Sequence, residues 1–168
     1  MLAKRGKFEE AENNFQDAIL IERERFGSSH PEVAISLAGL GELRRRQGQL
    51  SAAEDFYRQA LGIDRTALPG THPQTASHLA GLGDIFLKAG DAKSAEPLAR
   101  EALQIWQKRA GANCWQANAV ESQLGSILAA RGRRDEAEPL LAHSYQALRE
   151  KFGPRAEVTR LAFQRLTE

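Results

Sequence analysis

The sequence predicts an all-α protein that consists of repeated antiparallel helix hairpins. The first observation is a period of 42 residues, which appears in glycines and in Ala-Glu pairs. The glycines are Gly6, Gly48, Gly90 and Gly132, and the pairs are Ala11-Glu12, Ala53-Glu54, Ala95-Glu96 and Ala137-Glu138. Two series that keep one register indicate that a single structural unit repeats along the chain.

The second observation is the spacing of apolar residues inside each unit. Residues such as Leu37 and Leu40, and then Tyr57 and Leu61, recur at helical intervals and do not alternate as in a strand. A Leu-Gly pair also recurs with the same period, as Leu40-Gly41, Leu82-Gly83 and Leu124-Gly125. Glycine costs about 1 kcal/mol relative to alanine inside a helix, so its recurrence indicates that another backbone passes close by.

Each full unit is predicted to contain two helices. The first helix begins at His30-Pro31 and again at His72-Pro73, because proline suits the first helical position. This helix ends near Gly48 or Gly90, and the two histidines are interpreted as residues that enter a helix. The second helix is expected from about residue 51 to residue 65, and from about residue 92 to residue 109.

The predicted organisation is one domain over residues 1–168. It comprises a partial repeat at 1–27, full repeats at 28–69, 70–111 and 112–153, and a capping helix at 154–168. Residues 1–5 are expected to be the last turn of a first helix, followed by a second helix over about 7–25. In the capping helix, Val158, Leu161, Ala162 and Leu166 form one apolar stripe.

The partial repeat carries apolar residues that lack a full partner helix on one side. End units of repeat proteins normally have a polar outer face, and this one has Phe8, Phe15 and Ile19. Two explanations stay open: the chain is a fragment of a longer protein, or this N-terminal edge is an interface, including one with another copy of the chain.

Composition restricts the functional classes. The chain has 42% hydrophobic and 27% charged residues with a formal net charge of +1, so no strong field attracts nucleic acid or an anionic membrane. It has no long apolar span and no secretory leader pattern, and we expect a cytoplasmic protein. The single cysteine, Cys114, cannot form an internal disulfide or a zinc ligand pair, so packing must hold the fold.

These residues resemble the tetratricopeptide (TPR) signature, which has Leu-Gly-x-x-Tyr on one helix and Ala-x-x-x-Phe on the next. The best matches are Leu82-Gly83-x-x-Phe86, Ala11-x-x-x-Phe15 and Ala53-x-x-x-Tyr57. The 42-residue period and the Phe-Gly-x-x-His-Pro link are similar to the kinesin-light-chain type of repeat. The resemblance implies a right-handed superhelical α-solenoid that binds peptides or partner proteins on a concave surface lined by first helices.

Two positions depart from that resemblance. The light-chain repeat usually carries an Asn-Asn pair that can hold a ligand backbone, and this chain has Ala38-Gly39, Ala80-Gly81 and Ser122-Gln123 there. The fourth unit replaces His-Pro with Cys114-Trp115. The cargo specificity of the light chain therefore does not transfer to this sequence.

The predicted binding groove is the first-helix stripe opposite the Leu-Gly positions. Its residues are Ile35, Ala38, Glu42, Arg45, Arg46, Ser77, Ala80, Asp84, Leu87, Lys88, Ser122, Gln123, Ser126 and Ala129. The arginines could hold carboxylates of a peptide of mixed charge through paired hydrogen bonds. The alternative is that these arginines are simply solvated cations, which are favourable at the end of a helix.

No residue pattern predicts catalysis, a cofactor or a metal site. His78 and His143 have no cysteine or paired carboxylate at ligand or catalytic spacing in the sequence. Trp106 and Trp115 are expected to pack beneath the links between helices, and Cys114 is interpreted as an inert thiol.

We therefore expect a non-enzymatic scaffold that binds a peptide or partner-protein segment in its groove. The alternative function is a self-associating or regulatory assembly module of a larger signalling protein. Expected partners are proteins or peptides, including another copy at the N-terminal edge, with no nucleic acid and no membrane.

Overall fold

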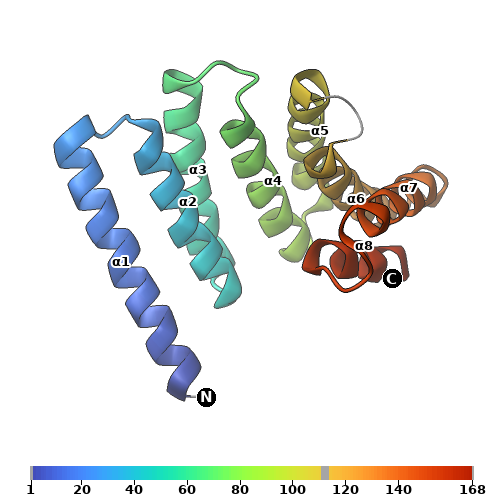
Figure 1. Ribbon diagram of the computed structural model, residues 1–168, viewed down its shortest axis with the longest axis horizontal. Helices are drawn as coiled ribbons and strands as arrows, with labels where there is room; N and C mark the ends of the chain where they lie inside the picture. The colour runs from blue at the N-terminus through green and yellow to red at the C-terminus, as the bar shows by residue number, and fades with distance from the viewer. Residues whose placement is uncertain (1, 111–113, 168) are drawn as a thin grey trace. The chain divides into compact units, whose positions relative to one another are not determined.

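The computed structural model describes residues 2–110 and 114–167, and within them the chain forms eight helices and no strand (Figure 1). The helices are α1 (Leu2–Phe26), α2 (Pro31–Arg46), α3 (Leu50–Ala67), α4 (Pro73–Lys88), α5 (Ala92–Ala110), α6 (Trp115–Ala130), α7 (Arg134–Phe152) and α8 (Glu157–Thr167). The predicted order of first and second helices is confirmed. The repeat boundary expected between residues 111 and 112 lies outside the described residues.

The chain divides into two compact units, residues 1–85 and 86–168. In the first unit, α2 packs against both α1 and α3. In the second unit, α6 packs against α5, α7 and α8, and α7 also packs against α8. The boundary between the units falls inside α4.

The core of each unit consists of small and branched apolar residues from both helices of a hairpin. Val33, Ala53 and Ala60 are buried in the first unit, and Ile127 and Leu148 are buried in the second. Alanine on second helices lets the neighbouring helix approach closely, and the leucines of first helices fill the remaining space.

Glycine ends the first helices with a backbone conformation that other residues rarely adopt. Gly48, Gly90 and Gly132 have φ values of 79°, 82° and 75°. A glycine in this left-handed region is a common C-terminal signal because it lacks a Cβ atom. The 42-residue glycine series therefore marks the turn inside each of these hairpins.

Gly6 belongs to the same series, but it does not form such a turn. Helix α1 runs from Leu2 to Phe26 and passes through Gly6, so the prediction that residues 1–5 belong to a separate first helix is wrong for the described residues. At Gly48 and Gly132 the turn is supported by α2 packing on α3 and by α6 packing on α7. Near Gly6 the described residues contain no first helix that could impose the turn, and the helix continues.

The residues before the first helices are N-caps, as predicted for the histidines. Nδ1 of His30 accepts a hydrogen bond from the backbone N–H of Glu32 at 3.3 Å, and Nδ1 of His72 accepts one from Gln74 at 3.3 Å. In the fourth unit Sγ of Cys114 accepts from the N–H of Ala117 at 3.4 Å. Cys114 therefore takes over the structural role of the histidine.

The recurring Leu-Gly glycines lie where the helices of a hairpin touch. A Cβ atom on Gly41 would lie 2.7 Å from Cδ2 of Tyr57, and one on Gly125 would lie 2.6 Å from Cγ of Leu141. The predicted close approach is confirmed at Gly41 and Gly125. The nearest neighbour is a large side chain of the second helix, and the backbone carbonyls of Ala53 and Ala137 are farther away, at 3.3 and 3.4 Å.

The C-terminal helix is present, but its buried face differs from the predicted stripe. Thr159 and Ala162 are buried, whereas Leu161 is 42% exposed. The hydroxyl of Thr159 donates to the carbonyl oxygen of Leu148, which fixes the rotation of α8 on α7 and turns Leu161 outward. None of the helices in the described parts of the chain is long and apolar enough to cross a lipid bilayer.

Candidate functional site

In the first unit the predicted groove contains a cluster of paired charges on α2 and α4. Glu42 accepts hydrogen bonds from Nε and Nη2 of Arg45 at 2.6 and 2.7 Å, and from Nε of Arg46 at 2.7 Å. Nη1 of Arg45 lies 3.9 Å from Oδ2 of Asp84. The spacing of three and four residues places all three side chains of α2 on one face of the helix.

Electrostatics keep this cluster ionised. Burial by itself raises the pKa of the Glu42 carboxyl, but the hydrogen bonds from Arg45 and Arg46 outweigh it and hold that pKa below its usual value. Burial raises the pKa of Tyr57 to about 12, with a further contribution from the charge of Glu42. Tyr57 is therefore a neutral phenol that serves packing between α2 and α4.

The two arginines of the cluster differ in what they offer a ligand. The side chain of Arg45 is 19% exposed and is oriented by two carboxylates, whereas that of Arg46 is 62% exposed. Arg46 can reorient toward a ligand carboxylate at little cost, because an exposed ion pair contributes about 0–1 kcal/mol. Arg45 acts better as a fixed charge on the surface.

The remaining predicted residues of the first unit have mixed exposure. Ile35 is 47% exposed, Ala38 is buried, and Ala80 is half-buried. The Ser77 hydroxyl donates to the carbonyl oxygen of Pro73 within its own helix. Ile35 is thus the large apolar side chain that this part of the surface presents.

In the second unit, part of the predicted groove lines a cavity of about 590 Å³. Its lining residues are Leu87, Ser126, Ala129, Ala130, Arg134, Glu138, Leu141, Arg165, Leu166 and Thr167. Leu87, Ser126 and Ala129 were predicted, and the residues of α7 and α8 were missed. No periodic signal marks Arg134 or Arg165, since their place depends on how α8 packs against α6.

The walls of this cavity are partly apolar and partly charged. Leu87, Leu141 and Leu166 provide apolar surface, and Arg134, Glu138 and Arg165 provide charges of both signs. The small residues Ser126 and Ala129 leave the space open. The Ser126 hydroxyl oxygen is buried and has no hydrogen-bond partner among the described residues.

Three predicted groove residues require correction, and the first is Ala38, which is only 8% exposed. Ser122 and Gln123 are only 1% and 3% exposed, because the packing of α6 encloses them. They offer almost no surface to a ligand, which contradicts the expectation that they line an open groove. Lys88, at the end of α4, is exposed as expected.

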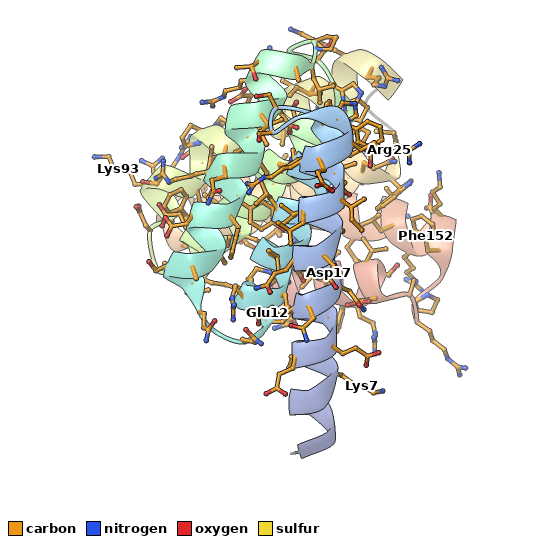
Figure 2. The ribbon with its side chains drawn as sticks, turned by 90° about the vertical axis from the view of Figure 1, so that its left-hand side faces the viewer. Lys7, Glu12, Asp17, Arg25, Lys93 and Phe152 are labelled. Carbon is orange, nitrogen blue, oxygen red and sulfur yellow. The ribbon has the colours of Figure 1, made fainter. Side chains whose placement is uncertain are left out.

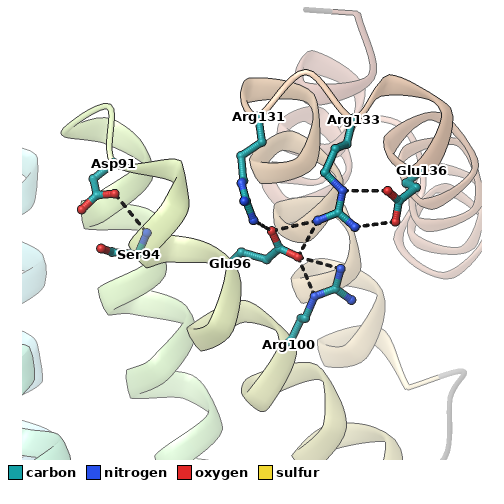
Figure 3. A network of polar contacts seen from close by, with 7 residues as sticks. All are labelled: Asp91, Ser94, Glu96, Arg100, Arg131, Arg133 and Glu136. Atoms are coloured by element: carbon teal, nitrogen blue, oxygen red, sulfur yellow. Dashed lines mark hydrogen bonds and ion pairs between the residues drawn. The ribbon is translucent and has the colours of Figure 1, made fainter.

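The Glu of the Ala-Glu series has a structural role that the sequence did not reveal. Glu96 on α5 accepts hydrogen bonds from Arg100, Arg131 and Arg133, and Arg133 also pairs with Glu136 at 2.7 Å (Figure 3). Burial raises the pKa of the Glu96 carboxyl, but the three arginines hold it below its usual value. Glu12 pairs in the same way with Arg44, so at these two positions the residue ties a second helix to the end of the following first helix, whereas Glu54 pairs with Arg58 within α3.

Both helical histidines have a carboxylate partner in space, which the sequence analysis did not identify. Nδ1 of His78 lies 2.8 Å from Oδ2 of Asp64, and Nδ1 of His143 lies 2.7 Å from Oε2 of Glu121. The partners are on preceding helices and not at a catalytic spacing in the chain. Within the described residues, no group of three or more His, Cys, Asp or Glu side chains could hold a metal ion.

An aromatic corner lies at the end of α7, where the sequence predicted buried tryptophans. Trp115 is 38% exposed and packs edge to face against Phe152, with ring centroids 5.7 Å apart. Trp106 is half-buried. The prediction of burial is therefore wrong for Trp115, which lies at the start of α6 beside Phe152 and the exposed Leu161.

Solved structures of known proteins resemble this chain. One is BtubC (BKLC) from P. vanneervenii, with a TM-score of 0.83 and 22% identity over 98% of this chain and 65% of that one. Another is a putative kinesin light chain from Podosopora anserina with nearly identical TPR-like repeats, with a TM-score of 0.75 and 20% identity. That match covers 97% of this chain and 77% of the other. A point variant of the same protein matches with the same coverage and identity and a TM-score of 0.76.

These likenesses show the fold, which is the α-solenoid of kinesin-light-chain-like repeats with a C-terminal helix. No curated protein sequence matches the chain significantly. Family models described as tetratricopeptide repeat match residues 1–66, and residues 75–113 and 122–155. Together with the hairpins and their Leu-Gly and Ala-Glu registers, these matches show that the chain belongs to the tetratricopeptide-repeat family.

Proposed function

We propose that this protein is a scaffold that binds a peptide or a segment of a partner protein on the surface formed by its first helices. Tetratricopeptide repeats generally mediate protein–protein interaction, which supports a protein partner. The observation that carries the finer proposal is the cavity of about 590 Å³, in which predicted groove residues lie beside apolar walls and charges of both signs.

The proposed ligand segment has an apolar side chain with polar or charged neighbours. Its apolar side chain enters the cavity beside Leu87 and Leu141, and the arginines at the rim bind carboxylate or carbonyl oxygens. Arg46, Ile35 and the Glu42 cluster provide a similar combination in the first unit. Such alternation of apolar and charged contacts suits an extended or helical peptide better than a small molecule.

The test is a selection of 12-residue peptides from a displayed random library, followed by titration of labelled peptides against the full chain. Ala129→Phe fills the cavity and should weaken binding at least about tenfold, which equals about 1.4 kcal/mol. Ala142→Phe adds the same side chain at an exposed position on α7 outside the cavity and should leave affinity unchanged.

A second pair of variants tests the charges. Combined Arg46→Glu and Lys88→Glu should weaken peptides that contain acidic residues, whereas Lys93→Glu, on the exposed side of α5, should not. If Ala129→Phe and the charge reversals leave the affinity of every selected peptide unchanged, the first-helix surface is not the binding site.

The localisation that suits this function is the cytoplasm.

A second candidate is an assembly module that associates through α1, with another copy or within a larger signalling protein. The observation that favours it is the exposure of Leu20 and Ile21, at 65% and 61%, on one helix. Light scattering over a hundredfold range of protein concentration distinguishes association with another copy from association within a larger protein. A mass that rises with concentration supports self-association, and a constant monomer mass excludes it.

A further inference from the structure

The ring of Tyr57 on α3 lies between α2 and α4 in the first unit. A Cβ atom on Gly41 of α2 would lie 2.7 Å from Cδ2 of this ring, and one on Gly81 of α4 would lie 2.3 Å from Cε1. The two glycines therefore face opposite edges of the ring. The Cβ position of Gly81 is also 2.5 Å from Cζ and 2.7 Å from the hydroxyl oxygen, so the polar end of the ring lies beside α4.

The repeat shows that this position needs a large side chain at most, and never a hydroxyl, for packing. The counterparts of Tyr57 in the other second helices are Phe15, Ala99 and Leu141. None of them has a polar side-chain atom. Helix α1, at the front of Figure 2, packs against α2, where a Cβ atom on Gly39 would meet Cε1, Cζ and Cδ1 of Phe15. Gly39 is the counterpart of Gly81, so phenylalanine fills the equivalent space without a hydroxyl.

The Tyr57 hydroxyl has no partner within the protein. Tyr57 is 7% exposed, and among the described residues its hydroxyl makes no hydrogen bond. Its oxygen is not one of the fully enclosed unpartnered atoms, in contrast to that of Ser126, so it stays open to solvent. A hydroxyl at the rim of a buried ring gains fewer hydrogen bonds than it has in water. Folding therefore gives no preference for tyrosine over phenylalanine at this position.

The hydroxyl opens onto the charged cluster of α2 and α4. Burial raises the pKa of Tyr57 to about 12, and the charges that also act on this pKa are those of Glu42, Arg45, Asp84 and Arg46. Two carboxylates and two guanidinium groups balance each other, so the surface around the hydroxyl has no net charge. The phenol keeps its proton at neutral pH and remains a hydrogen-bond donor.

We infer that the Tyr57 hydroxyl donates a hydrogen bond to a main-chain carbonyl oxygen of the bound peptide. The inference rests on the proposed function and names the peptide group that the first unit recognises. A neutral acceptor suits the balanced charges better than a carboxylate, which Glu42 and Asp84 would repel. Gly81 beside the hydroxyl is half-buried and has no side chain, so the backbone of a ligand can approach it closely.

The substitution Tyr57→Phe removes the hydroxyl and keeps the ring between the two glycines. It should leave the midpoint of urea unfolding unchanged or slightly higher, because the hydroxyl has no partner in the free protein. It should weaken binding of the labelled peptides selected against the full chain by about three- to tenfold. The peptides to compare are those that Arg46→Glu weakens, since they contact the first unit. Tyr145→Phe on α7 is the matched control and should leave their affinity unchanged.

Ester analogues of the peptides identify the acceptor. In each responding peptide, one main-chain amide at a time is replaced by an ester, whose carbonyl oxygen is a weaker hydrogen-bond acceptor. At one position the ester should weaken binding to the native protein at least about threefold. The same ester should have little effect on binding to Tyr57→Phe, because the interaction that it weakens is already absent from that variant.

A spectroscopic signal reports the hydroxyl directly. The chain has two tyrosines, so a ¹³C label at tyrosine Cζ gives a single resonance in Tyr145→Phe, that of Tyr57. A responding peptide should shift this resonance on binding. Its ester analogue at the identified position should shift the resonance less, because the hydrogen bond to the phenol is weaker.

Three results would overturn the inference. The first is unchanged affinity of Tyr57→Phe for peptides that Arg46→Glu weakens, which would make the hydroxyl a solvated group and leave the proposed function intact. The second is a clear fall in the urea midpoint of Tyr57→Phe, which would show a structural role. The third is an equal effect of every ester on the native protein and on Tyr57→Phe. If neither Arg46→Glu nor Ala129→Phe changes the affinity of any peptide, the proposed function fails and the inference fails with it.

Discussion

Oδ2 of Asp64 lies 2.8 Å from Nδ1 of His78, and the two side chains are 0% and 8% exposed. The same carboxylate accepts a hydrogen bond from Nε2 of Gln74 at 2.9 Å, and Gln74 donates to the carbonyl oxygen of Pro31 as well. This buried polar network joins α3 to α4 and reaches the start of α2. Its members have partners, so it contributes to stability only as long as it stays complete.

Asp64→Ala should therefore destabilise the protein by about 2–4 kcal/mol, because it leaves the buried His78 without its carboxylate partner and removes one of the two acceptors of half-buried Gln74. The measurement is the free energy of unfolding from urea titration. Asp55→Ala, at an exposed position of the same helix, should change it by less than about 0.5 kcal/mol.

A double-mutant cycle with His78→Ala separates the pair from the packing of each residue. We expect a coupling energy of about 1–3 kcal/mol between Asp64 and His78. A coupling energy close to zero would show that the two residues contribute independently and that the network is not the source of the stability.

The sequence predicted the architecture because repeat proteins use the same contact many times. Gly48, Gly90 and Gly132 each form the same turn, and His30 and His72 each form the same cap. Residues that recur for one physical reason can be recognised without a structure. The hairpin order, the approximate ends of the helices and the close approach at Gly41 followed from that recurrence.

Contacts that occur once could not be predicted in this way. The Asp64–His78 pair occurs once because the preceding unit has Glu22 bonded to Ser36 in the same register, and later units place other residues there. Trp115 is exposed because α8 turns Leu161 away from the core, which depends on the Thr159 hydrogen bond. Arg134 and Arg165 likewise line the cavity because of how α8 packs against α6.

The candidate groove was predictable in outline but not in its borders. First-helix spacing placed Leu87 and Ser126 beside the cavity and Glu42, Arg45 and Arg46 in one cluster. The same spacing also placed Ser122 and Gln123 on the groove surface, although they are buried. Helical periodicity gives the direction of a side chain, whereas burial depends on how far the neighbouring helices extend over it.

Glycine substitutions test the packing of the hairpins. Gly125→Ala should destabilise the protein by about 1–3 kcal/mol, because the new Cβ atom would lie 2.6 Å from Cγ of Leu141. Gly62→Ala is the matched control inside α3, where a Cβ atom meets nothing within 4 Å. It should stabilise the protein by about 0.5–1 kcal/mol through helix propensity.

Opposite signs for these two substitutions are the critical result, and urea unfolding of both variants measures it. If Gly125→Ala were neutral or stabilising, Leu141 would have space to move aside. The recurrence of Leu-Gly would then need a reason other than close packing.

The Glu96 network makes stability depend on pH in the acid range. Because the pKa of Glu96 is lower in the folded protein than in the unfolded chain, its contribution is complete above the unfolded value and is lost as pH falls through the folded value. Stability should therefore decrease below pH about 4.5. Glu96→Gln should reduce the slope of the unfolding free energy against pH in that range.

Glu101→Gln is the control, since Glu101 is exposed on the same helix. It should leave the slope unchanged. Unfolding by urea at pH values from about 6 to 3 gives the comparison, within the range where carboxylates titrate. An identical slope for Glu96→Gln and the native protein would mean that the arginines do not favour the ionised carboxylate.

The cap at Cys114 provides a test of how the fourth unit compensates for its missing histidine. Cys114→Ala removes the acceptor for the N–H of Ala117 and should cost about 0.5–1 kcal/mol of unfolding free energy. Cys114→Ser and Cys114→Asp keep an acceptor of better strength and should equal or exceed the stability of the native protein. Since serine and alanine are similar in size, lost packing of the sulfur would lower the stability of both variants equally, and that result would refute the capping role.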